Sequence, residues 1–93
     1  MVSLSHLYCF MALVEELHFG RAAERVGISQ PSLSEQIRRL EYELGVILFE
    51  RTSRRVSMTE SGQLLATNLP AALTQLERVI EAVRAQARGG WEM

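Results

Sequence analysis

The sequence predicts a mainly α-helical fold, in which three helices and a short β-hairpin precede one long helix. Three observations lead to this prediction. Apolar residues recur at three- and four-residue steps in three separate stretches before residue 45, which is the period of helices with one buried face. Two runs of β-forming residues then flank a turn, and a further apolar stripe at helical spacing extends from residue 69 to residue 87.

Length and composition are those of one small globular domain with an appended helix. The 93 residues can build only one modest core, and 47% of them are hydrophobic while 23% are charged. The formal charge of -1 by itself argues against a nucleic-acid binder, because such proteins usually carry a basic patch. Residues 38–55 nevertheless hold five arginines against three glutamates, so any positive patch is local.

Several classes of protein are excluded or disfavoured. Cys9 is the only cysteine, which rules out an internal disulfide, and its apolar neighbours predict a buried core position. No apolar run approaches the roughly 20 residues needed to cross a bilayer, and the N-terminus lacks the layout of a secretory signal. We therefore expect a cytoplasmic protein with no membrane partner.

The residues that could carry catalysis do not form a recognisable constellation. His6 and His18 have no Cys or Asp nearby, and a solvent-facing or core-edge position is the commoner role for such histidines. The serines at positions 29, 32 and 34 lack a histidine partner, and no glycine loop of the phosphate-binding type is present. The sequence predicts no enzymatic activity, no metal site and no cofactor.

The first two helices are predicted over residues 4–17 and 21–26. Ser3 is a plausible N-cap of the first, and residues 17–20 interrupt the apolar period. The second contains Ala22 and Ala23, whose small side chains allow another helix to approach closely. Gly27 suits a C-cap and Ile28 can insert into the core, so we expect a tight turn.

A third helix is predicted after Ser29, with Pro31 in its first turn and Gly45 at its end. The residues expected on its buried face are Leu33, Ile37, Leu40 and Leu44. A short helix, a tight turn and a longer helix with a polar face together predict a helix-turn-helix.

The β-hairpin is predicted from a strand at residues 46–51, a turn at residues 52–54 and a return strand at residues 55–59. An isolated hairpin is marginally stable in water, so this one must pack on the helices. Such a hairpin forms the wing of a winged helix-turn-helix. The sequence thus predicts this fold for residues 1–58.

The last helix is predicted to begin at Thr59, as its N-cap, and to end at Gly89. Its apolar stripe consists of Leu69, Leu73, Leu76, Ile80, Val83 and Ala87. The stripe extends beyond the reach of a small core, so residues 59–88 are predicted to form a dimerisation helix, with residues 89–93 as a tail. Pro70 removes one backbone hydrogen bond, and we expect a kink near residues 66–70.

The polar side of the third helix is the candidate binding surface. A helical wheel places four residues on the side opposite the core: Pro31, Glu35, Arg38 and Tyr42. Ser32 and Arg39 lie on one flank of this side, Ser34 lies on the other, and Gln30 lies at the N-terminal tip. Taken alone, such a face is more often solvated surface. The tight turn before it, the arginines of the hairpin after it and the dimerisation stripe favour docking into the major groove of DNA.

The run HFGRAAERVGISQPSLSEQIRRLEYELGVILFERTSRRVSMT at residues 18–59, followed by ESG, resembles the N-terminal DNA-binding region of LysR-type transcriptional regulators of bacteria. The resemblance implies a winged helix-turn-helix and a linker helix that pairs antiparallel with its twin, forming a homodimer on an interrupted inverted repeat of double-stranded DNA. It also implies DNA contacts by Ser29, Gln30, Pro31, Ser32, Ser34, Glu35 and Arg38, and wing contacts by Arg51, Arg54 and Arg55.

Family members carry a larger C-terminal domain that binds a small-molecule inducer, and nothing in this sequence resembles it. The chain is then either the DNA-binding part of a longer regulator, in which tetramers are possible, or a naturally short protein, and we expect the first.

Two positions depart from the family pattern. Glu35 stands where arginine is common, so we expect altered base preference or weakened affinity there. Gly20 stands where serine or threonine is frequent, so Gly20→Ser should tighten binding slightly.

The alternative reading is a helical protein-interaction module that does not bind specific DNA. The two hypotheses predict different effects of salt on DNA binding. Only the DNA-binding hypothesis predicts specific binding that weakens steeply as salt is added.

Overall fold

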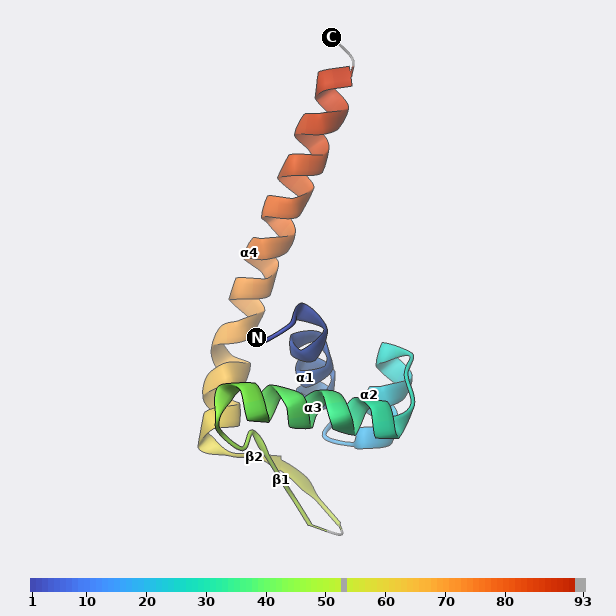
Figure 1. Ribbon diagram of the computed structural model, residues 1–93, viewed down its shortest axis with the longest axis vertical. Coiled ribbons are helices and arrows are strands. Elements are labelled where there is room, and N and C mark those ends of the chain that lie inside the picture. Colours follow the sequence, from blue (N-terminus) through green and yellow to red (C-terminus); the bar gives the residue numbers. More distant parts are fainter. Residues whose placement is uncertain (53, 92–93) are drawn as a thin grey trace.

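The computed structural model describes residues 1–52 and 54–91. Its elements are α1 (Leu4–Glu16), α2 (Phe19–Val26), α3 (Gln30–Leu44), β1 (Phe49–Arg51), β2 (Val56–Met58) and α4 (Glu60–Trp91). The molecule measures 60 × 25 × 22 Å. Helices α1, α2 and α3 cluster at one end, the hairpin projects from the cluster, and α4 runs away from it (Figure 1). This is the predicted winged helix-turn-helix with a long C-terminal helix.

The boundaries of the first two helices follow from their caps. Ser3 caps α1, since its Oγ accepts a hydrogen bond of 3.2 Å from the His6 N–H. The helix ends one residue earlier than predicted because Leu17 adopts a left-handed backbone with φ 47°. Helix α2 begins at Phe19, so the predicted start at residue 21 is wrong. The reason is that His18 is the N-cap, and its Nδ1 accepts a 3.0 Å hydrogen bond from the Arg21 N–H.

Helix α3 begins and ends as predicted. The Ser29 Oγ accepts a hydrogen bond of 3.2 Å from the Ser32 N–H, and Gly45 closes the helix with a left-handed φ of 73°. Of the four residues expected on its buried face, Leu33, Ile37 and Leu40 are fully buried. Leu44 is 42% exposed, so its prediction is wrong: it is the last residue of α3, beyond the part that the other helices cover.

The hairpin is antiparallel and pairs Phe49 with Met58 and Arg51 with Val56. Both strands have three residues, so the predicted ranges 46–51 and 55–59 are too long. The cause lies in Glu41 of α3, whose carboxylate accepts hydrogen bonds from the N–H groups of Leu48, at 2.7 Å, and Phe49, at 3.3 Å. Because Glu41 binds the Leu48 N–H, only the hydrogen bond from the Thr59 N–H to the Leu48 carbonyl, at 3.0 Å, continues the pairing beyond Phe49 and Met58.

The core joins all the elements of the winged helix-turn-helix. Its fully buried large side chains include Phe10, Leu13, Leu33, Ile37, Leu40 and Leu48. The hairpin is attached through Phe49, whose ring centroid lies 5.4 Å from that of Phe10. Cys9 is buried as predicted, and burial raises the pKa of its thiol. This core holds α3 with its apolar side inward and its polar side at the surface.

Helix α4 starts at a tight joint. The Thr59 Oγ1 accepts a hydrogen bond of 3.0 Å from the Gly62 N–H, which confirms the predicted cap. Its hydroxyl also donates to the Ile47 carbonyl at 2.6 Å, so the cap binds the helix to the segment before β1. Gly62 is buried, and a Cβ there would meet the carbonyl oxygen of Leu48.

The helix continues through Pro70 and through Gly89 to Trp91, so the predicted end at Gly89 is wrong. Glycine lowers helix propensity by about 1 kcal/mol but does not by itself stop a helix. The last two residues of the predicted tail, 92–93, lie outside the described residues, and the kink near Pro70 stays a prediction. Over the described part of the chain, no helix has the length and apolar character needed to cross a membrane.

Candidate nucleic-acid interface

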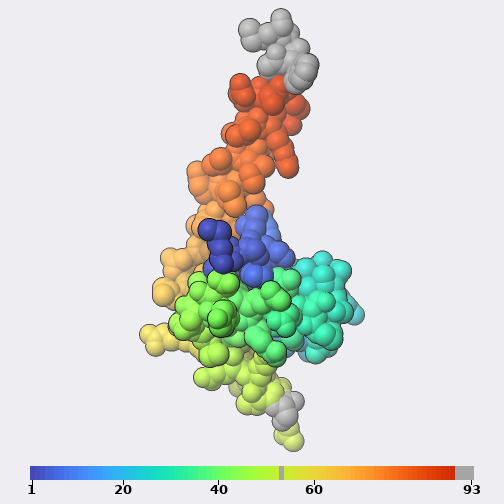
Figure 2. All heavy atoms as spheres, in the orientation of Figure 1, coloured from blue at the N-terminus to red at the C-terminus, as the bar shows by residue number. Residues whose placement is uncertain are grey.

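The polar side of α3 lies on the surface, as the helical wheel predicts. The predicted contact residues on it are exposed, except Ser34, which is half-buried: Ser29, Gln30, Pro31, Ser32, Ser34, Glu35 and Arg38. In the space-filling view, the atoms of α3 form a continuous surface above the hairpin (Figure 2). We call this surface the α3 face.

Two serines at the tip of α3 have different roles. The Ser29 hydroxyl accepts from the Ser32 N–H as the helix cap and donates to the Ser32 Oγ at 2.9 Å. Ser29 therefore has little capacity left for another partner. Ser32 accepts within this pair, so its own O–H is available to donate to a base edge or a phosphate.

The charges of the α3 face are partly paired. The Glu35 Oε1 lies 3.5 Å from the Arg39 Nε, an ion pair across one helical turn. Glu35 thus offsets the charge of Arg39 and is not an isolated acid on the surface. Arg38 is exposed and has no ion pair among the described residues, so it is the available cation of this face.

Sequence reasoning missed the contribution of His18 to this region. A side chain on Gly20 would place its Cβ 3.0 Å from the His18 Cε1 and 3.7 Å from the Gln30 Oε1. The His18 ring, while capping α2, thus takes up part of the space into which a serine hydroxyl at position 20 would project. Histidine is not among the preferred caps, so the sequence carries no strong signal for this role.

The three wing arginines occupy different environments. The Arg51 guanidinium carbon lies 4.2 Å from the centroid of the Phe19 ring, a cation–π contact that braces the hairpin against α2. Arg54 and Arg55 have exposed side chains near the turn, and their backbone N–H groups donate to the Thr52 Oγ1 at 3.3 and 3.1 Å. The wing therefore offers two exposed arginines near its turn, while Arg51, the last residue of β1, packs on Phe19.

The predicted dimer stripe divides into two parts. Leu69 and Leu73 are buried in the core of their own chain, so they are not a free surface. The exposed members are Leu76, Ile80, Val83 and Ala87, and Val79, which sequence reasoning missed, joins them at 50% exposed. We call these five residues the distal stripe.

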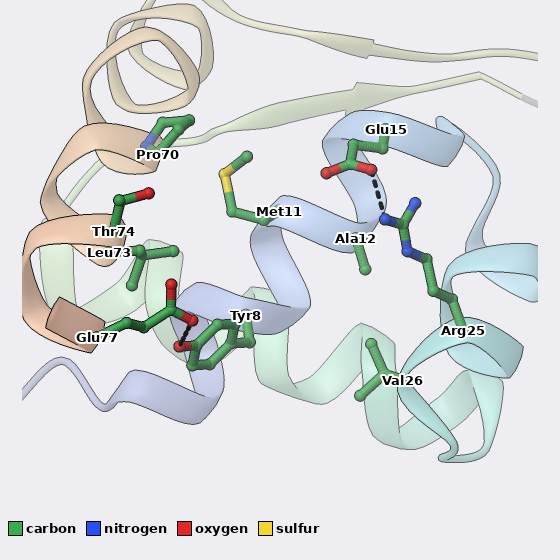
Figure 3. Close-up of a pocket in the computed structure, with 10 residues that line it drawn as sticks. All are labelled: Tyr8, Met11, Ala12, Glu15, Arg25, Val26, Pro70, Leu73, Thr74 and Glu77. Carbon is green, nitrogen blue, oxygen red and sulfur yellow. Dashed lines mark hydrogen bonds and ion pairs between the residues drawn. The ribbon is translucent and has the colours of Figure 1, made fainter. Parts of the chain in front are cut away.

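A groove of about 420 Å³ between α1, the end of α2 and α4 lies beside the start of the distal stripe (Figure 3). Across it, the Tyr8 hydroxyl donates to the Glu77 Oε2 at 3.1 Å. This bond raises the pKa of Tyr8 above its ordinary value. At the other end of the groove, the Arg25 guanidinium lies 2.6 Å from the Glu15 Oε2.

Comparisons with known proteins agree with this geometry. The family described as "Bacterial regulatory helix-turn-helix protein, lysR family" matches residues 4–63. The HTH-type transcriptional regulator AlsR of Bacillus subtilis is 46% identical over 88 residues, which cover 95% of this chain and 29% of AlsR.

Two solved structures have similar folds. A crystal structure of a BenM DBD/catB site 1 DNA complex has a TM-score of 0.85 and 39% identity, over 91% of this chain and 96% of that chain. A crystal structure of Vibrio fischeri DarR in complex with DNA has a TM-score of 0.89 and 30% identity, over 95% of this chain and 30% of that one. The chain therefore spans less than a third of the length of AlsR and of DarR.

Proposed function

Because the chain belongs to the lysR family of bacterial regulatory helix-turn-helix proteins, we propose that it is the sequence-specific DNA-binding part of a transcription regulator. The observation that carries the proposal is the α3 face, a rigid polar surface held outward by Leu33, Ile37 and Leu40 and flanked by an arginine-bearing hairpin. The BenM and DarR structures, both of complexes with DNA, support it.

The N-terminal part of α3 enters the major groove. Gln30, at the exposed tip, bonds the edge of an adenine, and the Ser32 hydroxyl donates to a neighbouring base or phosphate. The small residues of this turn allow the backbone to approach the DNA closely. Arg38, one of the exposed cations, contacts guanine or phosphate.

The wing contacts the DNA beside the half-site read by α3. Arg54 and Arg55 reach phosphates or the minor groove, while Arg51 keeps the hairpin at a fixed angle through its contact with Phe19. Each bound phosphate releases counterions, so a chain of net charge -1 can still bind a polyanion through local arginines.

A second copy of the chain covers the distal stripe. Five exposed apolar residues on one side of a helix are unfavourable in water, and an antiparallel twin helix buries them. The homodimer duplicates the α3 face, which fits an inverted repeat.

The whole regulator would act in the cytoplasm, and its inducer and any tetramer contacts would belong to segments outside this chain. No catalytic, metal-binding or cofactor role is assigned to the chain.

Selection of bound sequences from a random DNA pool tests the proposal. The purified chain is expected to enrich an interrupted inverted repeat, and binding to it should weaken steeply between 50 and 200 mM salt. Binding no stronger than that of scrambled DNA would favour the alternative, a helical protein-interaction module.

A further inference from the structure

An exposed apolar patch at the C-terminal end of α3 is not used by the proposed contacts. Tyr42 is 84% exposed and Ile47 is 59% exposed, and both lie next to the half-exposed Val46. With Arg38, Glu41 and Gly45 they line a hollow of about 510 Å³, which we call the Tyr42 hollow. Side chains of this size gathered at a surface commonly mark an interaction site.

The hollow is preformed. Its floor is held by hydrogen bonds from the Gly45 N–H to the Glu41 carbonyl, at 2.8 Å, and from the Val46 N–H to the same carbonyl, at 3.2 Å. The Glu41 carboxylate accepts from the Leu48 and Phe49 N–H groups. The backbone beneath the hollow is therefore fixed by hydrogen bonds within the chain.

The charge of the hollow suits an anion with an apolar part. Two charged side chains line the hollow: the Glu41 Oε2 accepts hydrogen bonds from the Leu48 and Phe49 N–H groups, whereas Arg38 has no ion pair among the described residues and is the cation that an anion would meet. The Tyr42 hydroxyl can donate one hydrogen bond. Val46 and Ile47 supply an apolar wall. A phosphate joined to a sugar matches these three features.

The position of the hollow points to the same occupant. Tyr42 lies one turn beyond Arg38 on the α3 face, and about 16 Å beyond Pro31 along the helix axis. This distance exceeds the width of the major groove, which is about 12 Å, so when the tip of α3 lies in the groove Tyr42 lies outside it, where the sugar–phosphate backbone borders the groove.

We propose that the Tyr42 hollow binds one sugar–phosphate unit at the edge of each DNA half-site. Arg38 and the Tyr42 hydroxyl hold the phosphate, and Ile47 and Val46 pack against the deoxyribose. The inference rests on the proposed DNA binding and adds residues to it. Such a contact carries no sequence information but fixes the register in which Gln30 and Ser32 meet the bases.

The first test compares two tyrosine variants. Tyr42→Phe removes a hydroxyl that donates to a phosphate, and it should weaken binding about 5- to 20-fold on operator and scrambled DNA alike. The salt dependence should stay the same, because no charge is lost. The matched control is Tyr8→Phe, which removes the other tyrosine hydroxyl in the groove beside α4 and should change affinity less than about twofold.

A second measurement locates the contact. Each phosphate of a half-site is replaced in turn by an uncharged methylphosphonate, and affinity is measured for the unchanged chain and for Tyr42→Phe. Replacement of one phosphate at the edge of the half-site should weaken binding by the unchanged chain, and it should weaken binding by Tyr42→Phe clearly less.

The outcomes distinguish a failure of this inference from a failure of the proposed DNA-binding function. The inference alone would be overturned if the unchanged chain binds DNA specifically, Tyr42→Phe and Ile47→Asn bind it with the same affinity, and no phosphate replacement has an effect that depends on Tyr42. The occupant of the hollow would then be a protein partner. Failure of the unchanged chain to bind DNA specifically would overturn both.

Discussion

The two halves of α4 differ in what covers their apolar side. In the first half, Leu69 and Leu73 are buried against the core of the same chain. In the second, the distal stripe continues with similar spacing and is exposed, with Val83 at 63%. The boundary lies near the hydrogen bond between Tyr8 and Glu77, and beyond it α4 extends alone (Figure 1). One helix thus stabilises the domain with one half, and the proposed dimer covers the other half.

The largest effect is expected where the first half joins the domain. Gly62→Ala would place a Cβ against the backbone carbonyl of Leu48, which cannot move without displacing β1. We expect a loss of about 3 kcal/mol in the free energy of unfolding, measured by thermal denaturation. The matched control is Gly89→Ala, whose added Cβ meets nothing within 4 Å. Equal stability of the two variants would contradict the account of this joint.

The distal stripe is sensitive in a different way. Val83→Glu puts a charge on the surface that the proposed partner covers, and the dissociation constant of the dimer should rise about 100-fold while the monomer stays folded. Sedimentation at several concentrations measures this. Ala85→Glu is the control, because residue 85 lies about 200° around the helix from residue 83. A dimer that withstands Val83→Glu but not Ala85→Glu would place the interface on the other side.

On the α3 face, Glu35→Ala removes the partner of Arg39 and frees that arginine for a phosphate. We expect a changed base preference and a salt dependence steeper by about one unit in the slope of log K against log salt. Glu81→Ala is the control, since it frees Arg88 from a 2.9 Å ion pair on α4, away from the DNA. Unchanged affinity and preference for Glu35→Ala would refute a role for this residue.

A smaller effect is expected at Gly20. Gly20→Ser adds a hydroxyl near the DNA but crowds the His18 ring, so binding should tighten about twofold while stability falls by roughly 0.5 kcal/mol. His18→Ala, which removes the cap and adds no hydroxyl, should lower stability without tightening binding. If Gly20→Ser leaves both affinity and melting temperature unchanged, neither contact is important.

The smallest effect concerns the boundary between the two halves of α4. The hydrogen bond to Glu77 raises the pKa of Tyr8 above 10.0 in the folded protein. The contribution of this bond to stability is therefore present below pH 10 and is lost as the pH rises through the higher folded pKa. Spectrophotometric titration of Tyr42→Phe, which leaves Tyr8 as the only tyrosine, should give a midpoint above 10.0. Adding Glu77→Ala should lower it, and an unmoved midpoint would show that the bond does not form in solution.

The sequence predicted best what depends on local periodicity and caps. Ser29, Gly45 and the buried positions Leu33, Ile37 and Leu40 are all determined within one helix, and they were predicted correctly. The extent of β1 was not, because the carboxylate of Glu41 binds the Leu48 N–H, which a longer strand would have used.

The division of α4 could not be predicted for a related reason. Its apolar period is similar on both sides of residue 77, and only the place where α1 stops covering it decides which residues are core. The roles of His18 and of Arg51 likewise depend on contacts that spacing along the chain does not reveal.

The length of DNA that the protein protects tests the central claim most directly, namely that the winged helix-turn-helix reads one half-site and the distal stripe of α4 pairs two such readers. Footprinting on the selected operator should show the unchanged chain covering both halves of an inverted repeat and Val83→Glu covering a single half at much higher concentration. Protection of both halves by Val83→Glu with undiminished affinity would contradict the claim.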